Sequence, residues 1–123
     1  MDFEVAAIDH VQLAMPAGRE DEAERFYCGL LGFARLPKPP TLARRGGCWF
    51  KRGQVQIHLG VEADFKAAKK AHPALVVNGF DAFRAAMQAA KIATRLDDEI
   101  PNTRRCYLED PFGNRLEIIE SAR

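Results

Sequence analysis

The stretch RCYLEDPFGNRLEIIE, residues 105–120, has the pattern of a β-hairpin. Polar and apolar residues alternate in its two arms, 105–109 and 114–120. Between the arms, DPFG at 110–113 places Asp, Pro and Gly at the first, second and fourth positions that a type I turn prefers. The stretch therefore predicts two antiparallel strands joined by a tight turn.

One residue of the second arm is unusual for a half-buried strand. Glu117 lies between Leu116 and Ile118, so its carboxylate points to the face opposite these aliphatic side chains. It shares that face with Arg115 and Ile119, so the face is neither purely solvent nor purely core. Glu117 is either a solvent residue of an edge strand or a metal ligand, and the rest of the chain must decide between the two.

The composition is that of a globular domain of 123 residues, with 47% hydrophobic and 28% charged residues. A net charge of +1 gives no reason to expect nucleic acid or an anionic membrane as a partner. No apolar run approaches the ~20 residues of a membrane span, and the acidic start MDFEVAAIDH does not resemble a secretion signal. The three cysteines form no CxxC pair, which favours reduced thiols. We therefore expect a cytoplasmic protein that acts on a small molecule.

Apolar periodicity divides the first half of the chain into one helix and several strands. The strands are predicted over residues 5–15, 33–36, 48–52 and 54–60. The helix is predicted over 19–31, with the apolar stripe Ala23, Phe26, Tyr27, Leu30 and Leu31. Gly32 supplies its left-handed stop, a loop is predicted over 37–47, and a charged connector over 61–71.

The second half repeats this order before it reaches the hairpin. A strand is predicted over 72–77 and another over 92–96. Between them, Asn78 is the predicted N-cap of a helix over 79–90. The apolar stripe of that helix is Phe80, Phe83, Met87 and Ala90.

Both halves thus have the order strand, helix, three strands. We interpret this as a duplication of βαβββ units within a single domain, 1–123, with unit one at about 5–61 and unit two at about 72–121. The predicted fold class is α+β, built from paired βαβββ modules.

The duplication places all three histidines and Glu117 at two repeated positions. His10 lies in the first strand of unit one, 62 positions before His72 in the first strand of unit two. His58 lies in the last strand of unit one, 59 positions before Glu117 in the last strand of unit two. Imidazole and carboxylate groups are ligands of divalent Zn, Ni, Co, Mn or Fe. We therefore predict a metal site formed by these four side chains, with two coordination positions left for water or a chelating substrate.

Four segments carry a resemblance to a known family. They are IDHVQLAM at 8–15, QIHLG at 56–60, HPALVV at 72–77 and DPFGNRLEIIE at 110–120. Together with the paired βαβββ order, they resemble the vicinal-oxygen-chelate superfamily. That superfamily includes glyoxalase I, methylmalonyl-CoA epimerase, extradiol dioxygenases, and fosfomycin- and bleomycin-resistance proteins. The resemblance implies a barrel-like mixed sheet, the glyoxalase/bleomycin-resistance fold, and a homodimer in which ligands from both chains often complete a site.

Matched residue by residue, His10, His72 and Glu117 correspond to the histidine, histidine and glutamate that recur as ligands in the superfamily. His58 stands where bacterial glyoxalase I has a glutamate and the epimerase has a glutamine. This departure argues against a strict glyoxalase I, and a filled fourth position argues against an extradiol dioxygenase. The resemblance implies catalytic roles for Glu117 and His58, with Glu117 or a hydroxide on the metal accepting the proton.

Substrate contacts are predicted for Arg115, Arg105 and Gln56. Guanidinium groups beside a metal favour a substrate with a carboxylate or phosphonate. The leading function is a metal-dependent, glyoxalase-like lyase or isomerase for a small substrate with vicinal oxygens, with or without a thiol co-substrate such as glutathione. A fosfomycin-resistance-like thiol transferase is the second candidate. The third is a metal-free, drug-sequestering protein of the bleomycin-resistance type, against which the full ligand set argues.

Overall fold

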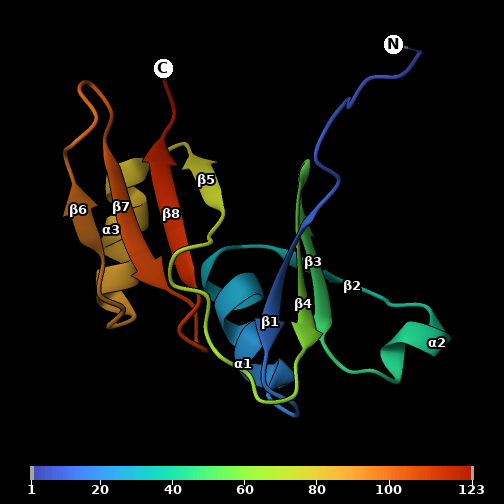
Figure 1. Ribbon diagram of the computed structural model, residues 1–123. Helices are drawn as coiled ribbons and strands as arrows, with labels where there is room; N and C mark the ends of the chain where they lie inside the picture. Colours follow the sequence, from blue (N-terminus) through green and yellow to red (C-terminus); the bar gives the residue numbers. More distant parts are fainter. Residues whose placement is uncertain (1, 123) are drawn as a thin grey trace.

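The computed structural model of the chain describes residues 2–122. It contains two four-stranded sheets, each accompanied by a helix of its own module (Figure 1). The elements of the first module are β1 (Val11–Met15), α1 (Glu20–Glu24), the π-helical η1 (Arg25–Leu30), β2 (Ala34–Leu36), α2 (Pro40–Ala43), β3 (Cys48–Arg52) and β4 (Val55–Val61). Those of the second are β5 (Ala74–Val77), α3 (Phe80–Ala89), β6 (Arg95–Asp97), β7 (Arg105–Glu109) and β8 (Arg115–Glu120). The α+β class and the paired βαβββ modules are confirmed.

The strand order is β1-β4-β3-β2 in the first sheet, here sheet A, and β5-β8-β7-β6 in the second, sheet B. Each module therefore starts with an edge strand that runs parallel to its last strand. Gln12 of β1 lies opposite His58 of β4, so His10 is two residues before the residue that faces His58. His72 has the same offset relative to Glu117. The repeat positions inferred from spacing are thus equivalent in strand register as well.

The predicted hairpin is present, and its turn is reinforced by a side chain. The Gly113 amide donates to the Asp110 carbonyl at 3.0 Å, which closes the turn. Asp110 Oδ1 accepts hydrogen bonds from the amides of Phe112 and Asn114, both at 2.9 Å. Asp110 is buried, so this carboxylate satisfies the turn's backbone donors from the inside.

Three strand boundaries differ from the prediction because tertiary pairing sets them. The strand expected over 5–15 is paired only from Val11, whose partner on β4 is Ile57. The strand expected from residue 72 begins at Ala74, since Pro73 has no amide hydrogen to donate to a ladder. The last helix ends at Ala89, one residue before its predicted end, but a turn follows it in which the Ile92 amide donates to the Met87 carbonyl at 2.8 Å. The strand that follows is accordingly shifted to β6.

The helices differ from the prediction at four points. The first helix widens into η1, whose turns hold more residues than α turns. Leu30 is therefore rotated out of the predicted stripe and is 37% exposed. The N-cap position of α3 is occupied by Gly79, with φ of 84°, where Asn78 was predicted. At the other end, Ala90 lies beyond the last residue of α3 and is exposed. The loop predicted over 37–47 contains the short helix α2. None of the helices within residues 2–122 has the length and apolarity that crossing a bilayer requires.

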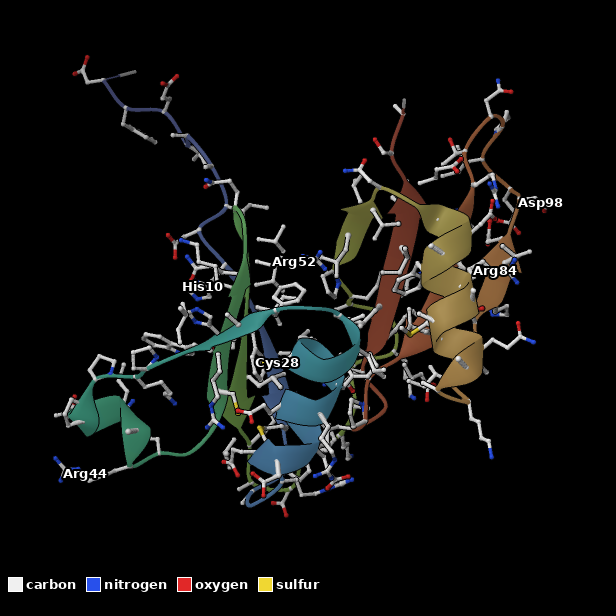
Figure 2. All side chains as sticks on the ribbon, turned by 180° about the vertical axis from the view of Figure 1, so that it is seen from behind. His10, Cys28, Arg44, Arg52, Arg84 and Asp98 are labelled. Carbon is white, nitrogen blue, oxygen red and sulfur yellow. The ribbon has the colours of Figure 1, made fainter. Side chains whose placement is uncertain are left out.

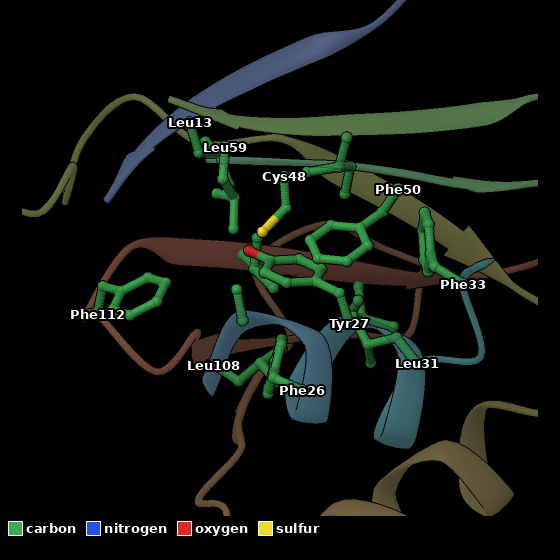
Figure 3. Close-up of a cluster of buried hydrophobic side chains, with 14 of the residues drawn as sticks. Leu13, Phe26, Tyr27, Leu31, Phe33, Cys48, Phe50, Leu59, Leu108 and Phe112 are labelled. Carbon is green, nitrogen blue, oxygen red and sulfur yellow. The ribbon is translucent and has the colours of Figure 1, made fainter. Parts of the chain in front are cut away.

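Tyr27 lies at the centre of the hydrophobic core (Figure 3). Its ring stacks on Phe50 of sheet A, with the ring centroids 5.2 Å apart, and meets Phe33 edge to face. Its hydroxyl donates to Asp110 Oδ2 at 2.8 Å, in the hairpin of the second module. Figure 1 shows α1 between the two sheets. The first helix therefore packs on its own sheet and is also hydrogen-bonded to the other module.

Candidate metal centre

Sheet B brings two of the four predicted ligands together. The Glu117 amide donates to the Pro73 carbonyl at 3.0 Å, which holds the segment before β5 against β8. His72 Nε2 consequently lies 2.9 Å from Glu117 Oε1. The other ring nitrogen, Nδ1, lies 2.8 Å from the Lys70 carbonyl oxygen. A carbonyl can only accept, so Nδ1 carries a hydrogen, and Nε2 is the ring nitrogen that faces the carboxylate.

This pair fits a metal ion. Ligand atoms about 2.1 Å from one ion and at adjacent positions lie roughly 3 Å apart, close to the Nε2–Oε1 separation. The bond from Nδ1 to a backbone carbonyl is the contact that orients most metal-binding histidines. A divalent cation would be held by His72 Nε2 and Glu117 Oε1.

Arg105 holds the free oxygen of Glu117. Its Nη1 donates to Glu117 Oε2 at 3.0 Å and its Nη2 donates to Asp97 Oδ1 at 2.9 Å. Burial raises the pKa of Glu117, but the hydrogen bonds from His72 and Arg105 outweigh it, so the pKa lies below its ordinary value. Glu117 is therefore ionised at neutral pH, as a metal ligand must be.

Sheet A carries the other two predicted ligands in a stack of rings. The ring of His58 lies between His10 and Trp49, with centroid distances of 4.0 and 4.6 Å. Gln56 Oε1 is 3.3 Å from His58 Nε2. Burial, and the neighbouring His10, lower the pKa of His58, which keeps its imidazole neutral and able to bind a metal. His10 and His58 would hold one ion together only after His10 turns out of this stack.

The two pairs are not joined within one copy of the chain. Within residues 2–122, no three His, Cys, Asp or Glu side chains converge on a metal-sized site. Figure 2 shows His10 on the side of sheet A that faces away from the second module. The structure therefore places the four predicted ligands in two separate pairs, His10 with His58 and His72 with Glu117, in place of one cluster of four; we call each pair a half-site of the predicted metal centre.

Sequence reasoning missed Asp97, the second carboxylate on Arg105. Asp97 and Arg95 alternate with Leu96 on β6, so both point to the face that carries Arg105 and Tyr107. The signal was present, but the predicted strand ended at residue 96. The other predicted substrate contacts lie beside the half-sites. Gln56 adjoins His58, and the guanidinium of Arg115 lies 5.4 Å from the centre of the Tyr107 ring. Their roles stay predictions.

The paired βαβββ modules and the repeated ligand positions define a class of proteins built by duplication of one such unit. The model of the Glyoxalase/Bleomycin resistance protein/Dioxygenase superfamily matches residues 7–118, and the chain belongs to this superfamily. A search of curated proteins found no match.

Solved structures agree with this assignment. A glyoxalase family protein from Bacillus anthracis is 45% identical, with a TM-score of 0.94, and the match covers 98% of this chain and 99% of that one. A lactoylglutathione lyase from Agrobacterium tumefaciens is 22% identical, with a TM-score of 0.71 and 95% of each chain covered. The fosfomycin resistance protein FosX from Listeria monocytogenes is 10% identical, with a TM-score of 0.77, and the match covers 97% of this chain and 96% of that one. The last two likenesses show the fold alone.

Proposed function

We propose that this protein is a metal-dependent, glyoxalase-like enzyme that acts on a small substrate with vicinal oxygens. We further propose that its metal centre forms between two copies of the chain, with sheet A of one facing sheet B of the other. The observation that carries the proposal is the pair of half-sites. Each holds two ligand side chains in equivalent strand register, and the two pairs do not converge within the described residues of one copy.

A twofold axis would complete both sites at once. In a symmetric dimer every contact occurs twice, so each sheet A pair would meet a sheet B pair of the partner. Exposed apolar side chains beside both half-sites support a covered interface. Ile8, two residues before His10, is 81% exposed. Val76, two residues after Ala74 and therefore on the same strand face as this partner of Glu117, is 67% exposed.

The bound ion would supply Lewis-acid stabilisation of negative charge that develops on the substrate's vicinal oxygens. Glu117 would be the group that accepts the substrate's proton. Arg105 would keep the carboxylate oriented through Oε2. Trp49 and Gln56 would fix the ring of His58 from its face and its edge. These roles match the catalytic assignments of Glu117 and His58 made from the sequence.

The test is metal content measured on protein purified without a histidine tag and supplied with each candidate ion. We expect about one metal per chain in the unmodified protein and a loss of at least tenfold in metal affinity in His72→Ala. Gln54→Ala, an exposed change in the turn between β3 and β4 and outside the half-sites, is the matched control and keeps full metal content. Substoichiometric metal in the unmodified protein after repletion would refute the proposal.

A fosfomycin-modifying activity is the second candidate. The arginines on the Glu117 face of sheet B favour it, because a phosphonate pairs well with guanidinium groups. Expression in a fosfomycin-sensitive host, followed by an inhibition assay, separates this activity from the first candidate. Unchanged tolerance at full expression would rule it out, while metal binding would still support the glyoxalase-like reaction.

A further inference from the structure

Three guanidinium groups surround the ring of Tyr107 on sheet B. The Cζ atoms of Arg95, Arg105 and Arg115 lie 5.0, 5.5 and 5.4 Å from the ring centre. They come from three adjacent strands, β6, β7 and β8. The negative face of an aromatic ring attracts a cation, but the three cations repel one another at this range. Such a cluster needs negative charge nearby.

Of the three arginines, only Arg105 is ion-paired among residues 2–122. It is paired with Asp97 and Glu117, as described above. Within residues 2–122, neither Arg95 nor Arg115 takes part in an ion pair. Their Cζ atoms are no more than about 10 Å apart, because both lie close to one ring. Two uncompensated guanidinium groups therefore share one small area of the face that carries the His72–Glu117 pair.

A hollow of about 430 Å³ opens between them. Thr94, Arg95, Tyr107 and Arg115 contribute to its lining, as do the carboxylate residues Glu109 and Asp110.

Both carboxylates are already engaged. Glu109 Oε2 accepts from Lys69 Nζ at 2.8 Å. Asp110 is buried and accepts from the turn and from Tyr27. The charged groups of the hollow that have no ion-pair partner are therefore the guanidinium groups of Arg95 and Arg115, which are positive.

We propose that Arg95 and Arg115 bind an oxyanion of the substrate, a carboxylate or phosphonate group, in the hollow beside Tyr107. The inference rests on the proposed function, because it describes the substrate of that same centre. Tyr107 pairs with Glu117 across β7 and β8, and its ring lies 5.7 Å from that of His72. A substrate held by the two arginines thus places its neighbouring atoms beside the metal pair. Arg95 then makes the substrate contact that was predicted for Arg105, because Arg105 is engaged in holding Glu117.

The test uses the metal-free full chain, so that its outcome does not depend on metal binding. Methylphosphonate and acetate are titrated separately, and binding is followed by amide shifts in NMR spectra. We expect at least one probe to bind, with affinity at least tenfold lower in both Arg95→Gln and Arg115→Gln. Arg95→Lys keeps the positive charge but loses the paired N–H donors of the guanidinium group, so we expect an intermediate loss of affinity. The probe that binds more tightly identifies the oxyanion.

Arg44→Gln, an exposed change at the end of α2, is the matched control for net charge and leaves binding unchanged. Circular dichroism verifies that each variant is folded. Absence of binding by both probes, affinities unaltered in both variants, or an equal loss in Arg44→Gln would overturn the proposal. A failure of this kind leaves metal content at His72 unaffected, so it is distinguishable from failure of the proposed function.

Discussion

At the residue scale, Arg105 carries the densest set of charged contacts in the candidate site. It bridges Asp97 and Glu117, and all three side chains are between 10% and 13% exposed. Removing one member of a nearly buried ionic network leaves the others uncompensated. We expect Arg105→Gln to lower the free energy of unfolding, measured by urea denaturation of the metal-free protein at pH 7. Asp97→Asn, which leaves the bond to Glu117 in place, is expected to cost less. Equal costs would contradict this assignment.

The Cys48 thiol gives a pH dependence with a defined sign. Burial raises the pKa of Cys48 from 9.0 to about 11. Because the folded pKa exceeds the unfolded one, its contribution to stability is complete below pH 9.0 and is lost as the pH rises toward about 11. In Cys48→Ala, which lacks the thiol, the free energy of unfolding should fall by about 1–3 kcal/mol less over that pH window than in the unmodified protein. Denaturation curves from pH 8 to 11 measure it. Cys28→Ala, at a more exposed position, is the control.

At the element scale, the start of β3 depends on a glycine that has no room for a side chain. Gly47 has φ of +85°, and a Cβ there would lie 2.2 Å from the Leu59 carbonyl oxygen of β4. Gly18 has a similar φ of +79° but nothing within 4 Å. We expect Gly18→Ala to cost about 1 kcal/mol, from backbone strain alone. Gly47→Ala should cost at least ~3 kcal/mol, because β3 must move away from β4. Thermal and urea unfolding measure both, and similar costs would contradict the argument.

The individual strands and helices differ in how far the sequence alone could predict them. The β7–β8 hairpin was predictable because alternation and turn residues act over a few positions, and β7 was located correctly. The start of β1 was not, because its pairing with β4, more than forty residues away, decides it. The four ligand candidates followed from repeat spacing. Their division into two half-sites did not, because it depends on α1 packing between the sheets and on the Tyr27–Asp110 bond.

At the scale of the whole molecule, a site assembled from two copies predicts complementation between defective chains. His58→Ala disables the sheet A pair and Glu117→Ala disables the sheet B pair, so each variant alone should lose metal at both sites of its homodimer. In a mixed dimer, one site combines both defects, and the other combines the intact sheet A of one copy with the intact sheet B of its partner. Mixed dimers purified through two different tags, neither containing histidine, should therefore bind about half the metal of the unmodified dimer.

The matched control places both defects on the same sheet. In a mixed dimer of His72→Ala and Glu117→Ala chains, each site receives one defective sheet B, so we expect no metal at either. A centre formed within a single chain gives no recovery in either mixture, because every chain then carries a defect in its own site. Metal content measured side by side in the two mixed dimers thus separates the two architectures. Recovery in the first mixture and none in the second is possible only if sheet A and sheet B of different copies face each other across the ion.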